Sequence, residues 1–414
     1  MNNWKKTFAI IWTGQFFSIL SSSIVGFACI LWLSLETGSA EVLAIAAISS
    51  LLPQTVLGFF SGVFVDRWNR KKVMIISDMF IAFCSLLLAG LFYMGEIKPG
   101  YIYALLALRS VGSSFHVPAM QASVPLLAPS SELVRISGIN QIIYSVSNIA
   151  GPALGALFIT VFDMTYVLLF DVLGASIACT SLLFVVIPNP EKTEHKQAPN
   201  LFREIREGLQ EIIKSRGLTW LFVFSIISMF FLMPISVMFP LMTLQHFAGN
   251  TFQVSLVEIV WGMGMMLGGF ILGIKQIKYN KVAVINCMYV ILGLSFLLSG
   301  VLPPSGFVFF VILTVLGGIS GSVFHAMFTA VIQLNVAPQA LGRVFSMFGS
   351  LSMIPSLIGL SAIGIIADVI GIPKSFIISG AVIITAGVAS FFVPPLMKIG
   401  QSKESENKKS LNTE

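Results

Sequence analysis

The sequence has few charged residues. Only 10% of its 414 residues are Asp, Glu, Lys or Arg, whereas 56% are hydrophobic. Soluble proteins carry roughly a quarter charged residues, so this chain lacks the polar surface that a water-soluble protein needs. Its four cysteines, Cys29, Cys84, Cys179 and Cys287, stand singly in apolar segments and form neither a disulfide framework nor a metal-ligand pattern. The composition therefore excludes a soluble enzyme and predicts an all-α membrane protein that crosses the bilayer several times.

Several functional motifs are also missing from the sequence. It contains no Gly-x-x-x-x-Gly-Lys-Ser/Thr phosphate-binding loop, so we expect that this chain does not itself use ATP, and a partner ATPase subunit stays an open question. No nucleophile, carboxylate pair or metal-ligand cluster suggests an enzyme. The net charge of +6 lies mostly in short loops, which points to membrane orientation and not to a nucleic-acid partner. We expect no cofactor and no metal.

Apolar segments long enough to cross the hydrocarbon core, at about 20 residues each, follow one another along the chain. They predict twelve transmembrane helices, at 8–33, 42–65, 73–94, 101–127, 136–160, 166–187, 218–245, 252–274, 281–302, 306–334, 342–367 and 374–396. We expect two six-helix halves, 1–187 and 218–398. They are joined by a cytoplasmic linker, 188–217, in which 201–213 has the apolar spacing of an amphipathic helix. The polar tail 399–414 is expected to be disordered.

The distribution of positive charge predicts the orientation of the chain. If both termini are cytoplasmic, 21 of the 24 Lys and Arg residues fall on the cytoplasmic side. Only Lys98 and Lys374 fall outside, and Arg109 lies within a predicted helix. Positive residues concentrate in cytoplasmic loops of membrane proteins, so this split predicts an even number of spans with both termini in the cytoplasm.

The two predicted halves share a repeated sequence. The segment Gly112–His116 matches Gly321–His325 at four of five positions, and Ala128-Pro129 matches Ala337-Pro338 at the same offset of 209 residues. Two halves that both start in the cytoplasm are parallel repeats related by an axis along the membrane normal. We interpret His116 and His325 as residues of repeat packing, with a proton role as the alternative.

The loop after the second predicted helix combines small, acidic and basic residues: Gly62, Asp66, Arg67, Arg70, Lys71 and Lys72. A glycine lets two helices approach closely. A carboxylate at the membrane edge accepts charge-assisted hydrogen bonds from a neighbouring helix end. We interpret this loop as a latch of the cytoplasmic side and expect Asp78, near the same side, to pair with its basic residues. The counterpart loop, 273–281, keeps its glycine and basic residues but lacks the Asp.

These residues resemble the signatures of the major facilitator superfamily. The 62–72 loop and the Arg109–Gly112 segment are similar to two of its motifs. Gly138, Gly151, Pro152 and Gly155 resemble its antiporter motif, although Ser147 and Ala156 stand where glycine is usual. Segments such as 170–175 and 341–346 resemble the macrolide efflux group of the drug:proton antiporters.

The resemblance implies a monomeric major facilitator fold in a bacterial cytoplasmic membrane. It also implies export of hydrophobic drugs such as macrolides in exchange for protons. For Pro152 and its neighbouring glycines, the resemblance favours a kinked seam between the halves that blocks leak, with tight helix packing as the alternative. Transport of another substrate, uptake in place of export, and a channel or scramblase stay open as alternatives.

Three ionisable residues fall within the predicted membrane segments: Glu258, Asp171 and Arg109. Such groups are costly in lipid and are functional candidates by default. A carboxyl group away from water favours its protonated form unless a cation pairs with it. We predict proton coupling by Glu258 first and Asp171 second, with Arg109 either holding a carboxylate ionised or responding to its protonation. A buried ion pair that only fixes helix packing is the alternative.

Flexible and aromatic side chains on the seventh and eighth predicted helices suit a large apolar substrate. The candidates are Met229, Met233 and Trp261, with possible polar contacts from Gln15, Asn140, Gln141 and Asn148. The alternative for each is contact with lipid or with the helix core.

Overall fold

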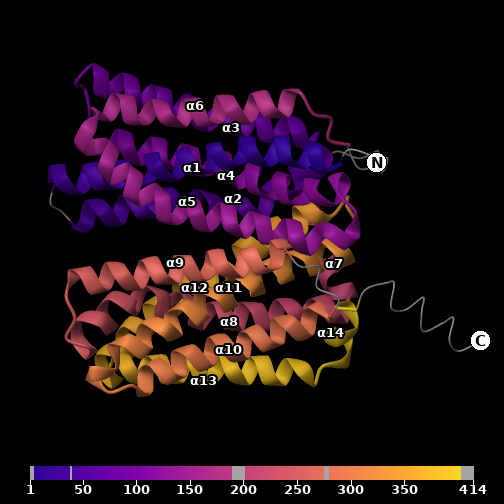
Figure 1. The fold of residues 1–414 in the computed structure, drawn as a ribbon. Helices are drawn as coiled ribbons and strands as arrows, with labels where there is room; N and C mark the ends of the chain where they lie inside the picture. Colours follow the sequence, from indigo (N-terminus) through magenta and orange to yellow (C-terminus); the bar gives the residue numbers. More distant parts are fainter. Residues whose placement is uncertain (1–3, 38–39, 189–200, 275–278, 402–414) are drawn as a thin grey trace, which may run out of the picture. The chain divides into compact units, whose positions relative to one another are not determined.

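The computed structural model describes residues 4–37, 40–188, 201–274 and 279–401, and it is α-helical throughout these ranges (Figure 1). Each predicted span overlaps one long helix. These are α1 (Trp4–Thr37), α2 (Ala40–Arg67), α3 (Arg70–Tyr93), α4 (Pro99–Leu127), α5 (Leu133–Val161), α6 (Met164–Leu183), α8 (Arg216–Leu241), α9 (Thr251–Ile274), α10 (Lys281–Val301), α11 (Phe307–Asn335), α12 (Leu341–Ile370) and α13 (Ile372–Phe391). Away from its ends, a helix satisfies its backbone hydrogen bonds within itself, and lipid requires this.

Five shorter elements accompany the long helices in the described residues, two of them the 3-10 helices η1 (Ser130–Glu132) and η3 (Pro304–Gly306). The other three are the linker helix α7 (Leu201–Lys214), the π-helical turn η2 (Met242–His246) and the final helix α14 (Pro394–Ile399). Most of the remaining linker (189–200), the loop segment 275–278 and the tail from residue 402 lie outside the described residues.

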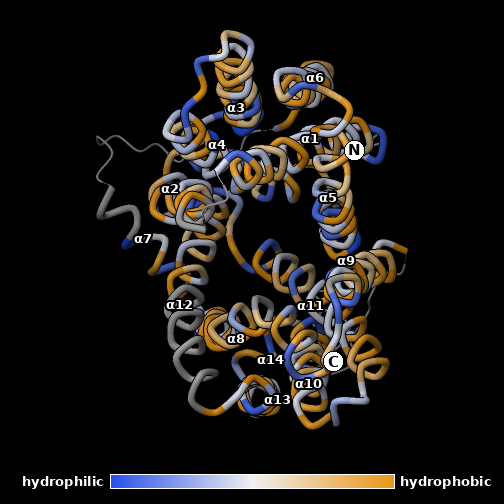
Figure 2. Tube along the Cα trace, turned by 90° about the vertical axis from the view of Figure 1, so that its left-hand side faces the viewer, coloured by the Kyte–Doolittle hydropathy of each residue, from blue (hydrophilic) through white to orange (hydrophobic). Residues whose placement is uncertain are grey.

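Hydrophobic residues dominate the long helices when these are viewed along their axes (Figure 2). Among the described residues, nine helices are long and apolar enough to cross a membrane, or ten if the bent pair Ile48–Gly58 and Phe60–Arg67 of α2 counts as one span. The chain is therefore a multi-pass membrane protein with an all-α fold.

The helices form two compact units. Unit 1 comprises Met1–Ser130, Val146–Leu209 and Val336–Ser350, and unit 2 comprises Ser131–Ser145, Gln210–Asn335 and Leu351–Glu414. Helices α5 and α12 each contribute one end to each unit.

The same packing order occurs in both units. In unit 1, α1 packs on α6, α6 on α3, α3 on α4, and α4 on α2. In unit 2, α8 packs on α13, α13 on α10, α10 on α11, and α11 on α9. Asn69 and Asn280 cap the equivalent helices α3 and α10, because each side chain accepts hydrogen bonds from first-turn backbone N–H groups. The sequence repeat thus has a counterpart in the packing.

The core of unit 1 lies between α1, α3, α4 and α6. Val25, Leu88, Ile102, Val167 and Leu168 are almost fully buried there. The same helices also bury polar side chains, among them Asp78, Arg109 and Asp171.

Candidate functional site

The carboxylate of Asp66 binds the start of α12 within unit 1. One oxygen, Oδ1, accepts from the backbone N–H of Gly342 at 2.7 Å. The other, Oδ2, accepts from the backbone N–H of Arg343 at 3.0 Å and from Nε of Arg343 at 3.1 Å. First-turn N–H groups have no partner within their own helix, and they attract negative charge. Asp66 therefore acts as an N-terminal cap that α2 supplies to α12.

A close approach of two glycines makes this contact possible. A Cβ on Gly62 would lie 2.4 Å from the carbonyl oxygen of Gly342, and a Cβ on Gly342 would lie 2.6 Å from Oδ1 of Asp66. Any side chain at either position would separate the two backbones. Further along the contact, the hydroxyl groups of Ser61 and Ser346 are 3.0 Å apart.

The basic residues of the loop bind backbone carbonyl groups and Asp66. Arg70 is fully buried, and its Nη1 donates to the carbonyl of Ala122 at 2.6 Å. It also donates to the carbonyl of Pro338 and lies 3.6 Å from Oδ1 of Asp66.

Lys71 donates to the carbonyls of Leu183 and Val185 at the C-terminal end of α6, where a cation is favourable. The backbone N–H of Lys72 donates to Asn69, and Arg67 lies in the last turn of α2. The sequence predicted a latch here, but it gave no indication that the segment around Gly342 would be the partner.

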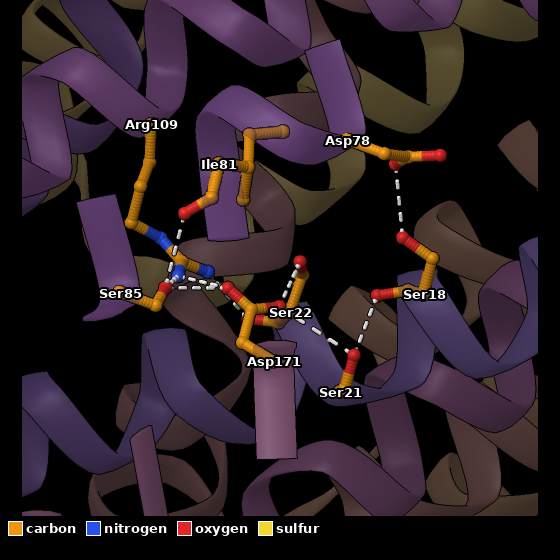
Figure 3. A network of polar contacts seen from close by, with 8 residues as sticks. All are labelled: Ser18, Ser21, Ser22, Asp78, Ile81, Ser85, Arg109 and Asp171. Atoms are coloured by element: carbon orange, nitrogen blue, oxygen red, sulfur yellow. Dashed lines mark hydrogen bonds and ion pairs between the residues drawn. The ribbon is translucent and has the colours of Figure 1, made fainter. Parts of the chain in front are cut away.

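Arg109 and Asp171 form a buried ion pair within unit 1 (Figure 3). Three serine hydroxyl groups also donate to Asp171: Ser22 at 2.7 Å, Ser85 at 2.6 Å and Ser21 at 3.5 Å. Arg109 in addition donates to Ser85 and to the carbonyl of Ser22. The structure thus brings together two of the three ionisable candidates. The run Ser21-Ser22-Ser23 in an apolar segment was the available signal for the serines, which the sequence analysis missed.

Asp78 lies apart from the 62–72 loop, so the prediction that it pairs with the loop's basic residues is wrong. Its Oδ1 accepts from the hydroxyl of Ser18 at 3.0 Å, and its Oδ2 accepts from Nε2 of Gln15 at 3.3 Å. Nε2 of His116 is 3.5 Å from Oδ1. Asp78 lies two turns into α3, where its side chain points toward α1 and α4. The residue spacing alone did not reveal this direction.

The glycines of the antiporter-like motif lie at helix crossings. In unit 2, a Cβ on Gly138 would lie 2.8 Å from the carbonyl of Gly269 on α9. In unit 1, a Cβ on Gly151 would lie 2.1 Å from the hydroxyl of Ser23, and one on Gly155 would lie 2.9 Å from the carbonyl of Ile24. Pro152 lies inside α5 beside this crossing with α1.

Glu258 is in unit 2, on α9. Its side chain is exposed, and within the described ranges it makes no hydrogen bond or ion pair. It therefore stays a candidate of unit 2, considered by itself.

The candidate substrate residues do not form one group. Gln15 is fully buried and belongs to the Asp78 contacts. Trp261 packs in an aromatic cluster with Phe239 and Phe296, at ring-centroid distances of 5.5 and 6.4 Å. Of the other candidates, one is buried (Gln141), two are half-buried (Asn140 and Met229) and two are exposed (Asn148 and Met233). In the part of the chain that the structure describes, no three His, Cys, Asp or Glu side chains gather as a metal site.

Comparisons with known proteins agree with these signatures. The family model of the Major Facilitator Superfamily matches residues 11–276 and 225–413. Macrolide efflux protein A of Streptococcus pyogenes is 37% identical over 96% of this chain and 98% of its own length. The multidrug efflux pump Tap of Mycobacterium tuberculosis is 24% identical over 93% of this chain and 92% of its own length.

Among solved structures, the fucose:proton symporter of E. coli matches with a TM-score of 0.75 at 12% identity. That match covers 97% of this chain and all of the symporter chain. At this identity the likeness concerns the fold alone. The family match, the curated relatives and the motif geometry lead to one conclusion: the chain belongs to the major facilitator superfamily of membrane transporters.

Proposed function

We propose that the protein exports hydrophobic drugs, with macrolides as the first class, in exchange for protons. The observation that carries this proposal is the 37% identity to macrolide efflux protein A over almost the full length of both chains. A wider drug range is the second candidate, because the multidrug efflux pump Tap also matches over most of its length. The proposed location is the bacterial cytoplasmic membrane.

The proposed architecture is a monomer of twelve transmembrane helices with both termini in the cytoplasm. Two parallel halves, 1–187 and 218–398, are joined by the linker 188–217 and rock about a central substrate site. The repeated packing order and the positive-inside charge distribution support this arrangement. In this scheme the contact of Asp66 with α12 is the cytoplasmic latch, and each transport cycle breaks and re-forms it.

Proton exchange requires a group that gains and loses charge. Glu258 is the proposed coupling carboxyl group of unit 2, since it is a lone carboxyl group on an apolar helix. Arg109 and Asp171 are proposed to hold helices α1, α3, α4 and α6 in register around the transport path. Candidate substrate contacts are Met229, Met233 and Asn148, which have side-chain surface available to a ligand.

The test is erythromycin accumulation in a susceptible bacterial host that expresses the chain, with and without a protonophore. We expect lower accumulation than in the empty host, restored both by the protonophore and by Glu258→Gln. Glu96→Gln removes an exposed carboxyl group outside the long helices and is the matched control, with wild-type export expected. Unchanged accumulation with the protein present in the membrane overturns the macrolide assignment. Export that persists in the presence of the protonophore overturns proton coupling.

A further inference from the structure

A second buried carboxyl group in unit 1 has partners of a different kind from those of Asp171. Asp78 and His116 are 3% and 7% exposed, and Gln15 is fully buried beside them. These side chains and Ser18 come from three helices, α1, α3 and α4, and converge on one carboxylate. Two of their atoms, Oε1 of Gln15 and Nε2 of His116, are buried and make no hydrogen bond within the described structure. The cluster therefore has unused capacity for hydrogen bonding.

The two carboxylates differ in how their charge is balanced. Asp171 is paired with Arg109, and an arginine keeps its charge in proteins. The negative charge of Asp171 is therefore balanced by Arg109 at any physiological pH, and this balance does not depend on a proton. Within the described residues, the only basic side chain in ion-pair range of Asp78 is His116, and histidine is the side chain that gains and loses a proton near neutral pH. The charge of the Asp78 cluster therefore depends on one proton.

We propose that Asp78 and His116 together form a proton-carrying site of this transporter. The inference deepens the proposed proton-coupled export and rests on it. One proton enters from the water on one side of the membrane and binds to the pair, and the same proton leaves to the water on the other side. No other bond is made or broken. With the proton bound, the pair has no net charge, which lowers the cost of holding it within the membrane.

Two ion pairs on the neighbouring helices are complete without the cluster. Outward along α4 and α6 lies the Arg109–Asp171 pair. Toward the start of α3, Arg70 is bound to Asp66 of α2, beside Arg67 in the last turn of that helix.

The ends of the neighbouring helices carry further charged groups, and none of those described forms an ion pair with Asp78. Lys71 and Lys72 lie in the first turn of α3, Lys5 and Lys6 in the first turn of α1, and Glu36 at the far end of α1. From α6, the thiol of Cys179 donates to the carbonyl of Ile75, one turn before Asp78. This leaves the proton on the Asp78–His116 pair as the variable that sets the charge of the cluster.

The equivalent position in unit 2 carries no carboxyl group. Counted from the capping residues Asn69 and Asn280, Asp78 in α3 corresponds to Tyr289 in α10. The hydroxyl of Tyr289 is 3.1 Å from that of Ser225 on α8, just as Asp78 binds Ser18 on α1. In unit 2, the helices thus pack at this position through an uncharged pair, Tyr289 and Ser225. Helix packing alone therefore does not require the carboxylate of unit 1, whereas a histidine stands at the equivalent position of His116 in unit 2 as well, at His325.

One turn of α1 connects the cluster with the Arg109–Asp171 pair. Ser18 donates to Asp78, Ser21 donates to the carbonyl of Ser18 and to Asp171, and Ser22 donates to Asp171 (Figure 3). A proton that binds at Asp78 weakens the hydrogen bond from Ser18 and so acts on the turn that holds Asp171. Binding of the proton at Asp78 can therefore change the position of α1.

The test is infrared difference spectroscopy on the purified full chain, titrated between about pH 5 and about pH 8, the range in which histidine changes charge. We expect a carboxyl or imidazole signal that is lost in Asp78→Asn and altered in His116→Gln. Over the same titration, Asp78→Asn is expected to take up about one proton per chain fewer than the wild type. Asp163→Asn, which removes an exposed carboxyl group before α6, is the matched control and keeps the signal.

Identical difference spectra in the wild type, Asp78→Asn and His116→Gln overturn the inference. If Asp78→Asn does not fold, Asp78→Glu replaces it, and a carboxyl band at an unchanged frequency overturns the inference as well. The spectroscopy uses no drug, so its outcome is separate from that of the erythromycin test. A missing signal alongside protonophore-sensitive export rejects this site alone, and an intact signal without export rejects only the proposed function.

Discussion

At the scale of single residues, the buried charges of unit 1 fall into two kinds. Asp171 has a permanent cation and three serine hydroxyl groups, which makes it part of the packing of four helices. The partners of Asp78 are a histidine, a glutamine and a serine, and none of them carries a permanent positive charge. Removing one partner of a buried ion pair costs far more than removing both, because the remaining charge has neither water nor a counter-ion.

This difference predicts the effect of breaking the Arg109–Asp171 pair. Arg109→Met should destabilise the protein by about 3 to 5 kcal/mol, and the double variant Arg109→Met/Asp171→Leu by clearly less. Thermal unfolding of the detergent-purified protein measures both. Lys214→Met breaks the exposed pair with Glu211 and should leave the melting temperature unchanged. A single variant as stable as the wild type would contradict the pairing.

At the scale of helices, glycines decide where two backbones touch. The crossing of α1 and α5 depends on Gly151 and Gly155, and the crossing of α2 and the start of α12 depends on Gly62 and Gly342. Membrane helices associate through close packing of this kind, since lipid offers no hydrophobic drive to bring them together. Gly90 of α3 differs from these residues, because a Cβ there would meet no atom within 4 Å.

The contrast gives a matched pair of variants. Gly155→Val should lower both the melting temperature and erythromycin export, because its Cβ would lie 2.9 Å from the carbonyl of Ile24. Gly90→Ala should leave export unchanged and raise stability by up to about 1 kcal/mol, the helix propensity difference between the two residues. Thermal unfolding and the accumulation assay provide the readouts. Equal effects of the two variants would show that the α1–α5 contact is not tight.

At the scale of the whole molecule, charge and hydropathy govern how the chain inserts. The 21 Lys and Arg residues assigned to the cytoplasmic side, against Lys98 and Lys374 outside, give a strong orientation signal. The described helices include nine or ten that are clearly long and apolar enough to span. The proposed total of twelve follows from the alternation of loops across the membrane.

Reporter fusions test this topology. Alkaline phosphatase, which is active only outside the cytoplasm, should be active when fused after Lys98 or Lys374 and inactive at the C-terminus. Green fluorescent protein at the C-terminus should fluoresce. An active phosphatase at the C-terminus would mean an odd number of spans and would contradict the proposed architecture.

The sequence by itself determined the all-α membrane class, the place of each long helix, the internal repeat and the resemblance to the family. Composition, apolar run length and local motifs are properties of short segments, and lipid allows few other structures for them. It also singled out Asp66, Arg109 and Asp171 as residues of interest.

Only the tertiary structure decided which of these residues meet. It paired Arg109 with Asp171, brought Asp66 to Gly342 and Arg343, and placed Asp78 beside His116 and away from the basic loop. Such contacts depend on which helices are neighbours and on the direction in which each side chain points from its helix. Residues separated by 38 to 277 positions in the chain carry no local signal of that arrangement, because it is set by the packing of whole helices.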